Sequence, residues 1–320
     1  MRIATSYFGN RTVRHVARDM RRLRSEGFDV VVHTMSEHDL AFYRVTMGEI
    51  VAATRDAGLE VWMAPWGVGG VFGGEAFSRI ALQQPDWLQT TADGTRLPAC
   101  CPSHPSFREF VAGWIAAACE IGADAVFWDE PHFHETLARE GGCACCHCLR
   151  VATEREVDER NTPGSAQLLS FLEWACAVVE RERKSSAVCL LPPKAAGAPN
   201  LDWDAVARMP GVFSLGCTPF WALHTVEPEG LIRDIGQRLA ATTSSASIAS
   251  HLWIQGFSIP AGREDEIRRA VLSAGDISPD MIAIWGMDCC ASMSYLACER
   301  PEIAWRTFRD AVSDLRSLDS

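Results

Sequence analysis

Eight short runs of aliphatic, β-branched and aromatic residues recur along the chain, and each precedes a stretch with helical periodicity. The runs occupy residues 3–8, 30–34, 60–64, 125–129, 187–191, 212–217, 249–255 and 281–287. Strands that alternate regularly with amphipathic helices are typical of βα units built around a parallel sheet. Eight such units predict a (β/α)8 TIM barrel, formed as a single domain by residues 1–320.

The helical stretches carry the expected spacing and end signals. Between residues 107 and 119 the apolar positions recur on one face, namely Phe107, Phe110, Val111, Trp114, Ile115, Ala118 and Cys119. This face should pack on the barrel. Gly27, Gly58 and Gly122 each come shortly before the next strand, where the end of a helix favours a residue with positive φ.

Two connections are much longer than the others, residues 67–105 after the third strand and residues 131–163 after the fourth. Both are interrupted by Gly, Pro and Cys, and the first opens with the glycine-rich residues 67–74, which we interpret as a flap. Loops that follow strands form the catalytic face of a barrel. The sequence therefore predicts that these two loops surround the site.

The charge balance limits the class of partner. The formal net charge is -11, and Lys and Arg do not cluster beyond residues 18–24, which argues against nucleic acid or an anionic membrane. The N-terminus has no apolar stretch of signal-peptide length, and no run reaches the roughly 18 apolar residues of a membrane span. We expect a cytoplasmic enzyme with a small carbohydrate substrate, and the sequence leaves open whether it forms a homo-oligomer.

The most informative motif ends the fourth predicted strand, where Asp129 and Glu130 lie between Trp128 and Pro131. Catalytic groups of barrels sit at this end of the strands. Two carboxyl groups in a partly dry, aromatic site are what glycoside cleavage uses, because burial raises one pKa and leaves a proton for the departing oxygen. The alternative is a solvated acidic strand end.

A second motif carries metal-ligand spacing. Cys143, Cys145 and Cys148 form C-x-C-x2-C, and three thiolates this close can hold one tetrahedral zinc ion. Cys100 or Cys101, in the loop after the third strand, would supply the fourth ligand and make the zinc site structural. Free thiols or a redox pair are the alternative.

Together these motifs resemble a known family. The chain resembles the zinc-bearing β-galactosidases of the large retaining glycoside hydrolase clan and related uncharacterised glycosidase-like barrels. The resemblance lies in the order of three motifs: Cys101-Pro102-Ser103, then Asp129-Glu130-Pro131, then the cysteine motif. The resemblance implies that Glu130 is the general acid/base and that Asp129 stands where the clan has Asn. It also implies a structural zinc ion held by Cys101, Cys143, Cys145 and Cys148.

The sequence departs from that family at the seventh strand, where the clan places its nucleophilic Glu. Here the strand ends at Gln255, which cannot form a glycosyl ester. Our choice for the remaining carboxylate is Asp288, with Glu37, Asp39 and Asp129 as alternatives.

Residues at the strand ends are candidates for substrate binding because aromatic faces stack on sugar rings and polar groups bond to hydroxyls. We assign this role to Tyr7, Glu37, Trp66, His132, Trp221, Trp253, Gln255 and Trp285.

Three other functions remain open. Asp129, Glu130, His132 and His134, joined by His33 and His251, would suit a metal-dependent sugar isomerase, epimerase or lyase. Lys194 is a weaker candidate for a Schiff-base lysine. A barrel that binds carbohydrate without cleaving it is the non-enzymatic alternative.

Overall fold

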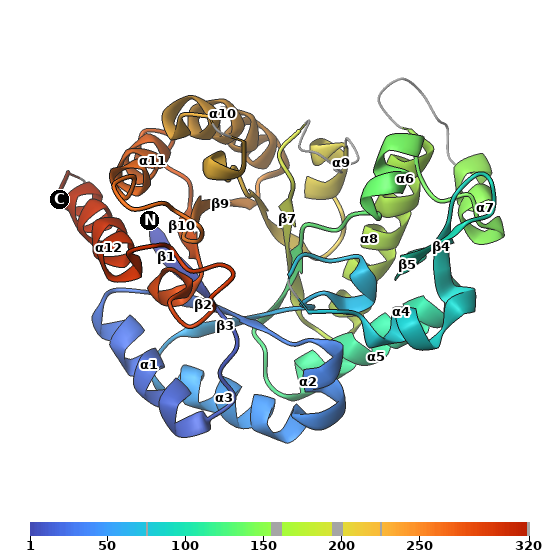
Figure 1. Ribbon diagram of the computed structural model, residues 1–320, viewed down its shortest axis with the longest axis horizontal. Coiled ribbons are helices and arrows are strands. Elements are labelled where there is room, and N and C mark those ends of the chain that lie inside the picture. Colours follow the sequence, from blue (N-terminus) through green and yellow to red (C-terminus); the bar gives the residue numbers. More distant parts are fainter. Residues whose placement is uncertain (75, 155–161, 194–200, 225, 319–320) are drawn as a thin grey trace. The chain divides into compact units, whose positions relative to one another are not determined.

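The computed structural model describes residues 1–74, 76–154, 162–193, 201–224 and 226–318. Eight parallel strands close into a barrel in the order β1-β10-β9-β8-β7-β6-β3-β2 (Figure 1). They are β1 Arg2–Tyr7, β2 Val30–Thr34, β3 Glu60–Ala64, β6 Ala125–Asp129, β7 Ser185–Leu190, β8 Val212–Cys217, β9 Ala249–Gln255 and β10 Met281–Trp285. The fold and all eight expected runs are confirmed.

Helices follow every barrel strand. They are α1 Val13–Ser25, α2 Glu37–Phe42, α3 Arg44–Asp56, α4 Arg79–Gln83, α5 Pro105–Glu120, α6 Glu135–Glu140, α7 Cys146–Glu154, α8 Pro163–Arg181, α9 Trp203–Ala207, α10 Pro228–Ala246, α11 Asp265–Gly275 and α12 Pro301–Leu318. None of the helices in the described ranges is long and apolar enough to cross a membrane.

The strands are buried along their length, as expected where helices cover a parallel sheet. Every residue of β2, β6 and β10 is buried, and β1 pairs with β10 and β2 in continuous register. Helix α5 buries the predicted face through Phe107, Val111, Trp114 and Ile115.

Gly27, Gly58 and Gly122 have φ values of 87°, 79° and 100° at the ends of α1, α3 and α5. Other residues adopt this conformation at a cost, so the three predicted helix stops are confirmed.

Contacts within the described chain divide it into two compact units. The first unit comprises Met1–Thr34, Glu49–Trp62 and Ser214–Ser320. The second unit comprises Met35–Gly48 and Met63–Phe213, and it contains both long loops and the Asp129-Glu130 pair.

The loop of residues 67–105 contains a small hairpin that the sequence analysis missed. Strands β4 Leu88–Thr90 and β5 Arg96–Cys100 pair antiparallel. Their turn is held by Thr91, which donates to Asp93 and to the carbonyl of Thr95. Such short strands give little periodic signal, and Pro98 inside β5 argues against a strand. Figure 1 shows the hairpin beside α7 in the second unit.

Candidate functional site

The acidic pair lies at the carboxyl end of β6, where the strand stops. Asp129 is 5% exposed, and Glu130 is partly exposed. Glu130 has φ 43°, a left-handed conformation that is uncommon outside glycine, and its backbone N–H donates to the carbonyl of Cys189 at 2.9 Å. Backbone strain of this kind concentrates at functional sites, because the surrounding structure must be arranged to hold it.

The environment of Asp129 favours its neutral form. Burial raises the pKa of this carboxyl group well above its usual value, and the neighbouring charge of Glu130 raises it further. Two adjacent carboxyl groups cannot both ionise easily in a dry site. We therefore expect Asp129 to hold a proton at pH values where an exposed aspartate is ionised.

The loop after β3 closes against this pair. The N–H of Gly73 donates to the carbonyl of Asp129 at 2.9 Å, and the N–H of His132 donates to the carbonyl of Val71 at 2.8 Å. A Cβ atom at position 73 would lie 2.8 Å from Asp129 Oδ2. Only glycine therefore lets the loop approach the Asp129 carboxyl group this closely.

Glu37 is bonded to the loop that follows β3. It is 6% exposed, and its carboxylate accepts from the N–H of Gly69 at 2.8 Å, from Ser78 Oγ at 2.6 Å and from the N–H of Ile80 at 2.9 Å. The structure thus shows Glu37 bonded within the protein, and its contact with substrate stays a prediction. Glu37 ties α2 to the loop that contacts Asp129.

The histidines after β6 do not converge on a metal. His132 Nδ1 lies 2.6 Å from the carbonyl oxygen of Glu130, and burial lowers the pKa of His132. His134 caps α6 through its Nδ1, which accepts from the N–H of Thr136 at 3.4 Å. Within the described ranges, Asp129, Glu130, His132 and His134 do not form a group with converging ligand atoms.

His33 and His251, proposed to join that metal site, are core residues. His33 Nε2 bonds to Thr54 Oγ1 and His251 Nδ1 bonds to Ser214 Oγ, each at 2.8 Å. Burial lowers the pKa of each histidine to about 3, so both are neutral. Lys194 lies outside the described residues.

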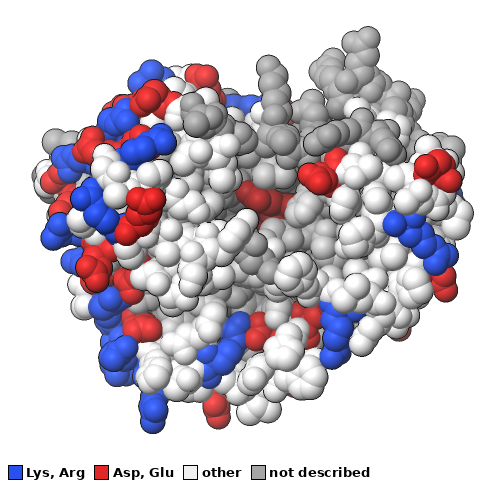
Figure 2. Space-filling view, viewed as in Figure 1, with Lys and Arg blue, Asp and Glu red and all other residues white. Residues whose placement is uncertain are grey.

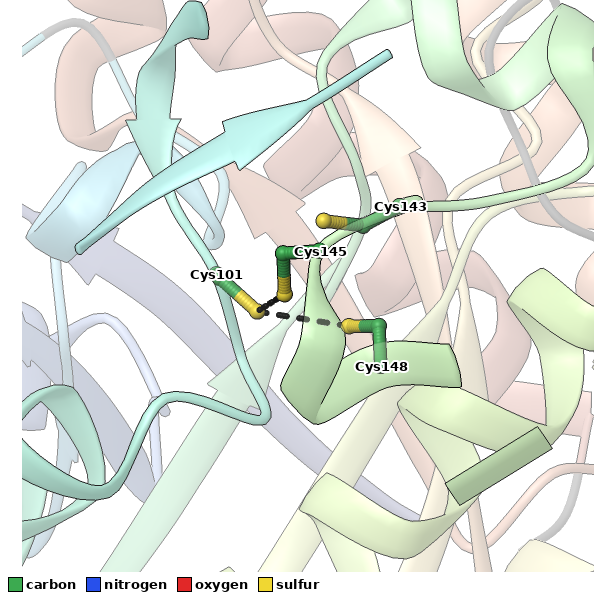
Figure 3. Close-up of side chains that lie close together, drawn as sticks. All are labelled: Cys101, Cys143, Cys145 and Cys148. Carbon is green, nitrogen blue, oxygen red and sulfur yellow. Dashed lines mark hydrogen bonds between the residues drawn. The ribbon is translucent and has the colours of Figure 1, made fainter. Parts of the chain in front are cut away.

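The four predicted cysteine ligands come together. The sulfur atoms of Cys101, Cys143, Cys145 and Cys148 all lie within 4.8 Å of one another. Among the described residues, these four form the one group whose ligand atoms lie close enough together to hold a metal ion. Cys101 Sγ is 3.3 Å from both Cys145 Sγ and Cys148 Sγ (Figure 3). Sulfur atoms bound to one tetrahedral zinc ion at about 2.3 Å are roughly 3.8 Å apart. The quartet fits such an ion.

Neighbouring groups hold the cysteine loop in place. The N–H of Thr90 in β4 donates to Cys143 Sγ at 3.3 Å, a contact typical of metal-bound thiolates. Gln167, on α8 and 1% exposed, bonds to the N–H and the carbonyl of Cys143 and to the carbonyl of Cys148. The cysteine cluster thus brings the two long loops together, as predicted, and Gln167 also connects it to α8, which was not predicted.

Three of the proposed substrate-binding residues in the first unit are interior residues. Trp221 and Trp253 are 0% exposed, and Trp221 Nε1 donates to Glu266 at 2.9 Å. Gln255, also 0% exposed, accepts from the N–H of Ala222 at 3.1 Å and donates to the carbonyl of Phe257 at 3.0 Å. All three side chains are thus engaged inside the protein, and a contact of any of them with substrate stays a prediction.

The remaining aromatic candidates keep a small exposed edge. Trp285 is 8% exposed and packs edge-on against Trp253, and Trp66 of the second unit is 7% exposed and packs against Gly74. Tyr7 is 5% exposed, and its hydroxyl donates to Asp19 at 2.8 Å and accepts from Asn10 at 3.0 Å. Substrate contacts by these residues and by His132 stay predictions.

Asp288 follows β10 and is held by an ion pair. Both of its carboxylate oxygens accept from Arg22 on α1, at 2.7 and 2.6 Å. It lines a cavity of about 400 Å³ in the first unit, together with Tyr7, Asn10 and Asp19. Both contacts come from the same nitrogen, Arg22 Nη2, and a charge-assisted hydrogen bond of this kind holds the carboxylate in its ionised form. The geometry therefore does not favour our assignment of Asp288 as the second catalytic group.

Several residues of the site were not found from the sequence. Gly73, Gln167 and Arg22 each act through a contact with a residue distant in the chain. The only available signal was the glycine-rich run of residues 67–74, which predicted a flap but not its contact with Asp129.

Fold and site define an α/β-barrel protein with an acidic pair at the end of β6 and a cluster of four cysteines that could hold a metal ion. No protein-family model matches the chain, and no curated protein matches it in sequence. Many solved structures share its fold. An endo-1,4-β-mannanase from Rhizomucor miehei has a TM-score of 0.64 at 11% identity, covering 98% of this chain and 94% of the mannanase.

Two further structures show how widely the fold is shared. An endo-β-1,4-mannanase from Thermotoga petrophila has a TM-score of 0.62 at 10% identity, covering 100% of this chain and 77% of that protein. A D-psicose 3-epimerase has a TM-score of 0.51 at 10% identity, covering 99% of each chain. At such identities the likeness concerns the fold, which hosts unrelated chemistries.

Proposed function

We propose that this protein is a glycoside hydrolase-like enzyme that cleaves a glycosidic bond in a small glycoside or oligosaccharide. The observation that carries the proposal is the strained Glu130 beside the buried Asp129 at the carboxyl end of β6. Glu130 is the partly exposed member of the pair and is our choice for the proton donor to the leaving oxygen, so in the reactive form Glu130 is protonated as well as Asp129. The mannanase barrels support this reading by their fold.

In this proposal Asp129 binds the sugar rather than reacting with it. A carboxyl group that keeps its proton has one donor and one acceptor oxygen, as an asparagine side chain has a donor and an acceptor. Because its pKa is raised, Asp129 can make the same kinds of hydrogen bond as the Asn that stands at this position in the clan that the chain resembles. We expect its carboxyl group to bond to a substrate hydroxyl.

The second carboxylate of the reaction remains unassigned. Gln255 ends β9 with both ends of its amide bonded, and Asp288 is engaged by Arg22. Product stereochemistry would narrow the choice, because a nucleophile about 5–5.5 Å from the acid retains the anomeric configuration, while a base at about 6.5–9.5 Å inverts it.

The cysteine quartet would hold zinc in a structural role. Four thiolates complete a tetrahedral site and leave no position for substrate.

We expect elemental analysis to find about one zinc ion per chain in wild type, and we expect this zinc to be lost in Cys148→Ser. That variant should lose roughly 4 kcal/mol or more of unfolding free energy. The matched control, Cys176→Ser, removes a buried thiol of α8 outside the quartet and should keep the metal. Equal zinc content in the two variants would contradict the assignment.

The function is tested by hydrolysis of a panel of α- and β-aryl glycosides and natural oligosaccharides. Wild type should turn over at least one of them, and Glu130→Gln should lose activity by roughly 10²–10⁴-fold. Glu135→Gln changes an exposed glutamate five positions further along the chain and should be fully active. Binding of a sugar without turnover, in folded and metal-loaded protein, would instead favour the non-catalytic barrel.

A further inference from the structure

The loop that follows β10 closes on itself. Inside it, the N–H of Met293 donates to the carbonyl of Cys290 at 2.8 Å and the N–H of Leu296 donates to that of Met293 at 2.9 Å. At its neck, the N–H of Cys298 donates to the carbonyl of Cys289 at 3.2 Å. Residues 289 and 298 therefore mark the two ends of a compact loop just before α12.

The first residues of this loop form a strained turn. Asp288, Cys289 and Cys290 have φ values of 52°, 51° and 60°, three consecutive non-glycine residues in the left-handed region. Left-handed residues other than glycine normally occur singly, so the surrounding contacts must hold this run in place. The Arg22 ion pair to Asp288 is one such contact, and the neck of the loop is another.

Three thiols gather at this neck. Cys289, Cys290 and Cys298 are 0%, 2% and 2% exposed. The thiol of Cys289 donates a hydrogen bond to the sulfur of Cys298, which lowers the pKa of Cys298. The backbone hydrogen bond from the Cys298 N–H to the Cys289 carbonyl, at 3.2 Å, keeps the two residues adjacent, as a disulfide between them requires. Cys289, Cys290 and Cys298 are separate from the quartet of Cys101, Cys143, Cys145 and Cys148.

We infer that Cys289 and Cys298 are a redox-active pair that forms a disulfide when the protein meets a small-molecule disulfide. The thiolate of Cys298 attacks one sulfur of the oxidant, whose S–S bond breaks, and the departing thiolate takes up a proton. The thiolate of Cys289 then attacks the sulfur of Cys298 in the mixed disulfide and expels the second thiol. The two cysteines lose two electrons and two protons, and the oxidant becomes two thiols.

The pair lies next to a cavity and to an exposed loop, and this position gives the bond a consequence. Cys290, beside the pair, lines the 400 Å³ cavity with Tyr7 and Asp288. The outer side of the loop is open to solvent, where Tyr295 is 81% exposed. A disulfide at the neck fixes the left-handed turn that forms part of the cavity wall. Oxidation therefore sets the shape of this cavity, independently of the proposed glycosidase chemistry.

The test is to expose folded wild-type protein to 2-hydroxyethyl disulfide, block the remaining thiols with N-ethylmaleimide and cleave with cyanogen bromide without reduction. Cleavage after Met287 and Met293 yields two fragments. Fragment 288–293 contains Cys289 and Cys290, and fragment 294–320 contains Cys298. We expect these fragments to be joined, and to separate after treatment with dithiothreitol. Recovery of separate fragments after prolonged oxidation of folded protein would overturn the inference.

Single variants identify the partner. Joined fragments should persist in Cys290→Ser and in Cys176→Ser, and be lost in Cys289→Ser and Cys298→Ser. The opposite result for Cys289→Ser and Cys290→Ser would assign the bond to Cys290 and overturn the pairing. In wild type, oxidation should raise the melting temperature by a few degrees, because the bond closes a short loop in the unfolded chain. This rise should be absent from Cys298→Ser.

Discussion

The ends of β6 and β10 both present carboxyl groups on positive-φ backbone, yet their surroundings differ. At β6, Asp129 is buried and its pKa is raised, with the partly exposed Glu130 beside it. At β10, Asp288 has a 40% exposed side chain and accepts twice from Arg22. The two strand ends thus differ in burial and in neighbours: Asp288 is partly exposed and paired with Arg22, whereas Asp129 is buried beside a second carboxyl group. Sequence position alone does not distinguish the two cases.

Replacing the two carboxylates should give the largest contrast. We expect Glu130→Gln to lower kcat/KM by roughly 10²–10⁴-fold, because it removes the proposed proton donor. Asp288→Asn should change kcat/KM less than about threefold, since Arg22 already occupies that carboxylate. The check is steady-state kinetics on the best substrate of the panel. A loss in Asp288→Asn as large as that in Glu130→Gln would return Asp288 to the reaction.

Gly73→Ala should have the next largest effect. Its methyl group would lie 2.8 Å from Asp129 Oδ2, so the loop or the carboxyl group must move. Misplacement of this size costs on the order of 10²-fold in activity. Gly113→Ala, on the exposed side of α5 with nothing within 4 Å of the added atom, is the matched control and should remain active. Equal activity of the two variants would show that the loop contact does not shape the site.

Asp129→Asn should stabilise the folded chain to an extent that depends on pH. The folded-state pKa of Asp129 lies above its ordinary value of 3.8, so ionisation destabilises the folded chain as the pH rises above that value. Asparagine does not ionise, and its stability advantage over wild type should therefore be absent near pH 3 and grow toward neutral pH. Melting temperatures across this range provide the measurement. An advantage that shrinks with rising pH would mean that the carboxyl group is stabilised as its anion.

Arg22→Gln should have the smallest effect. The Arg22 and Asp288 side chains are 41% and 40% exposed, and solvent screening limits such a pair to about 1 kcal/mol. Chemical denaturation should detect a loss of that size, reduced further at high salt. A loss above about 3 kcal/mol would indicate that the pair is essential to the strained turn at 288–290.

Much of the fold could be predicted from the sequence because parallel strands buried on both faces leave uninterrupted apolar runs. The cysteine quartet could also be predicted, since three of its members are close in sequence and the loop after the third strand offered Cys100 or Cys101 as the fourth; the family resemblance implied Cys101. The β4–β5 hairpin was missed because its strands are short and one contains Pro98.

The site was harder to predict in detail. Trp221 and Trp253 end up in the core and Glu37 bonds to the loop of Gly69, although their positions after strands matched those of ligand-binding residues. Which side of a strand end meets solvent depends on how later loops pack. No local pattern records the contact of Gly73 with Asp129 or that of Arg22 with Asp288.

The central claim is that Glu130 gives a proton to the leaving oxygen, and leaving-group dependence tests it most directly. The measurement compares kcat/KM of wild type and Glu130→Gln on a dinitrophenyl glycoside, whose leaving group needs no proton, and on the alkyl glycoside of the same sugar. The account predicts a small loss on the first substrate and a loss of roughly 10²-fold or more on the second. Equal losses on both would contradict it.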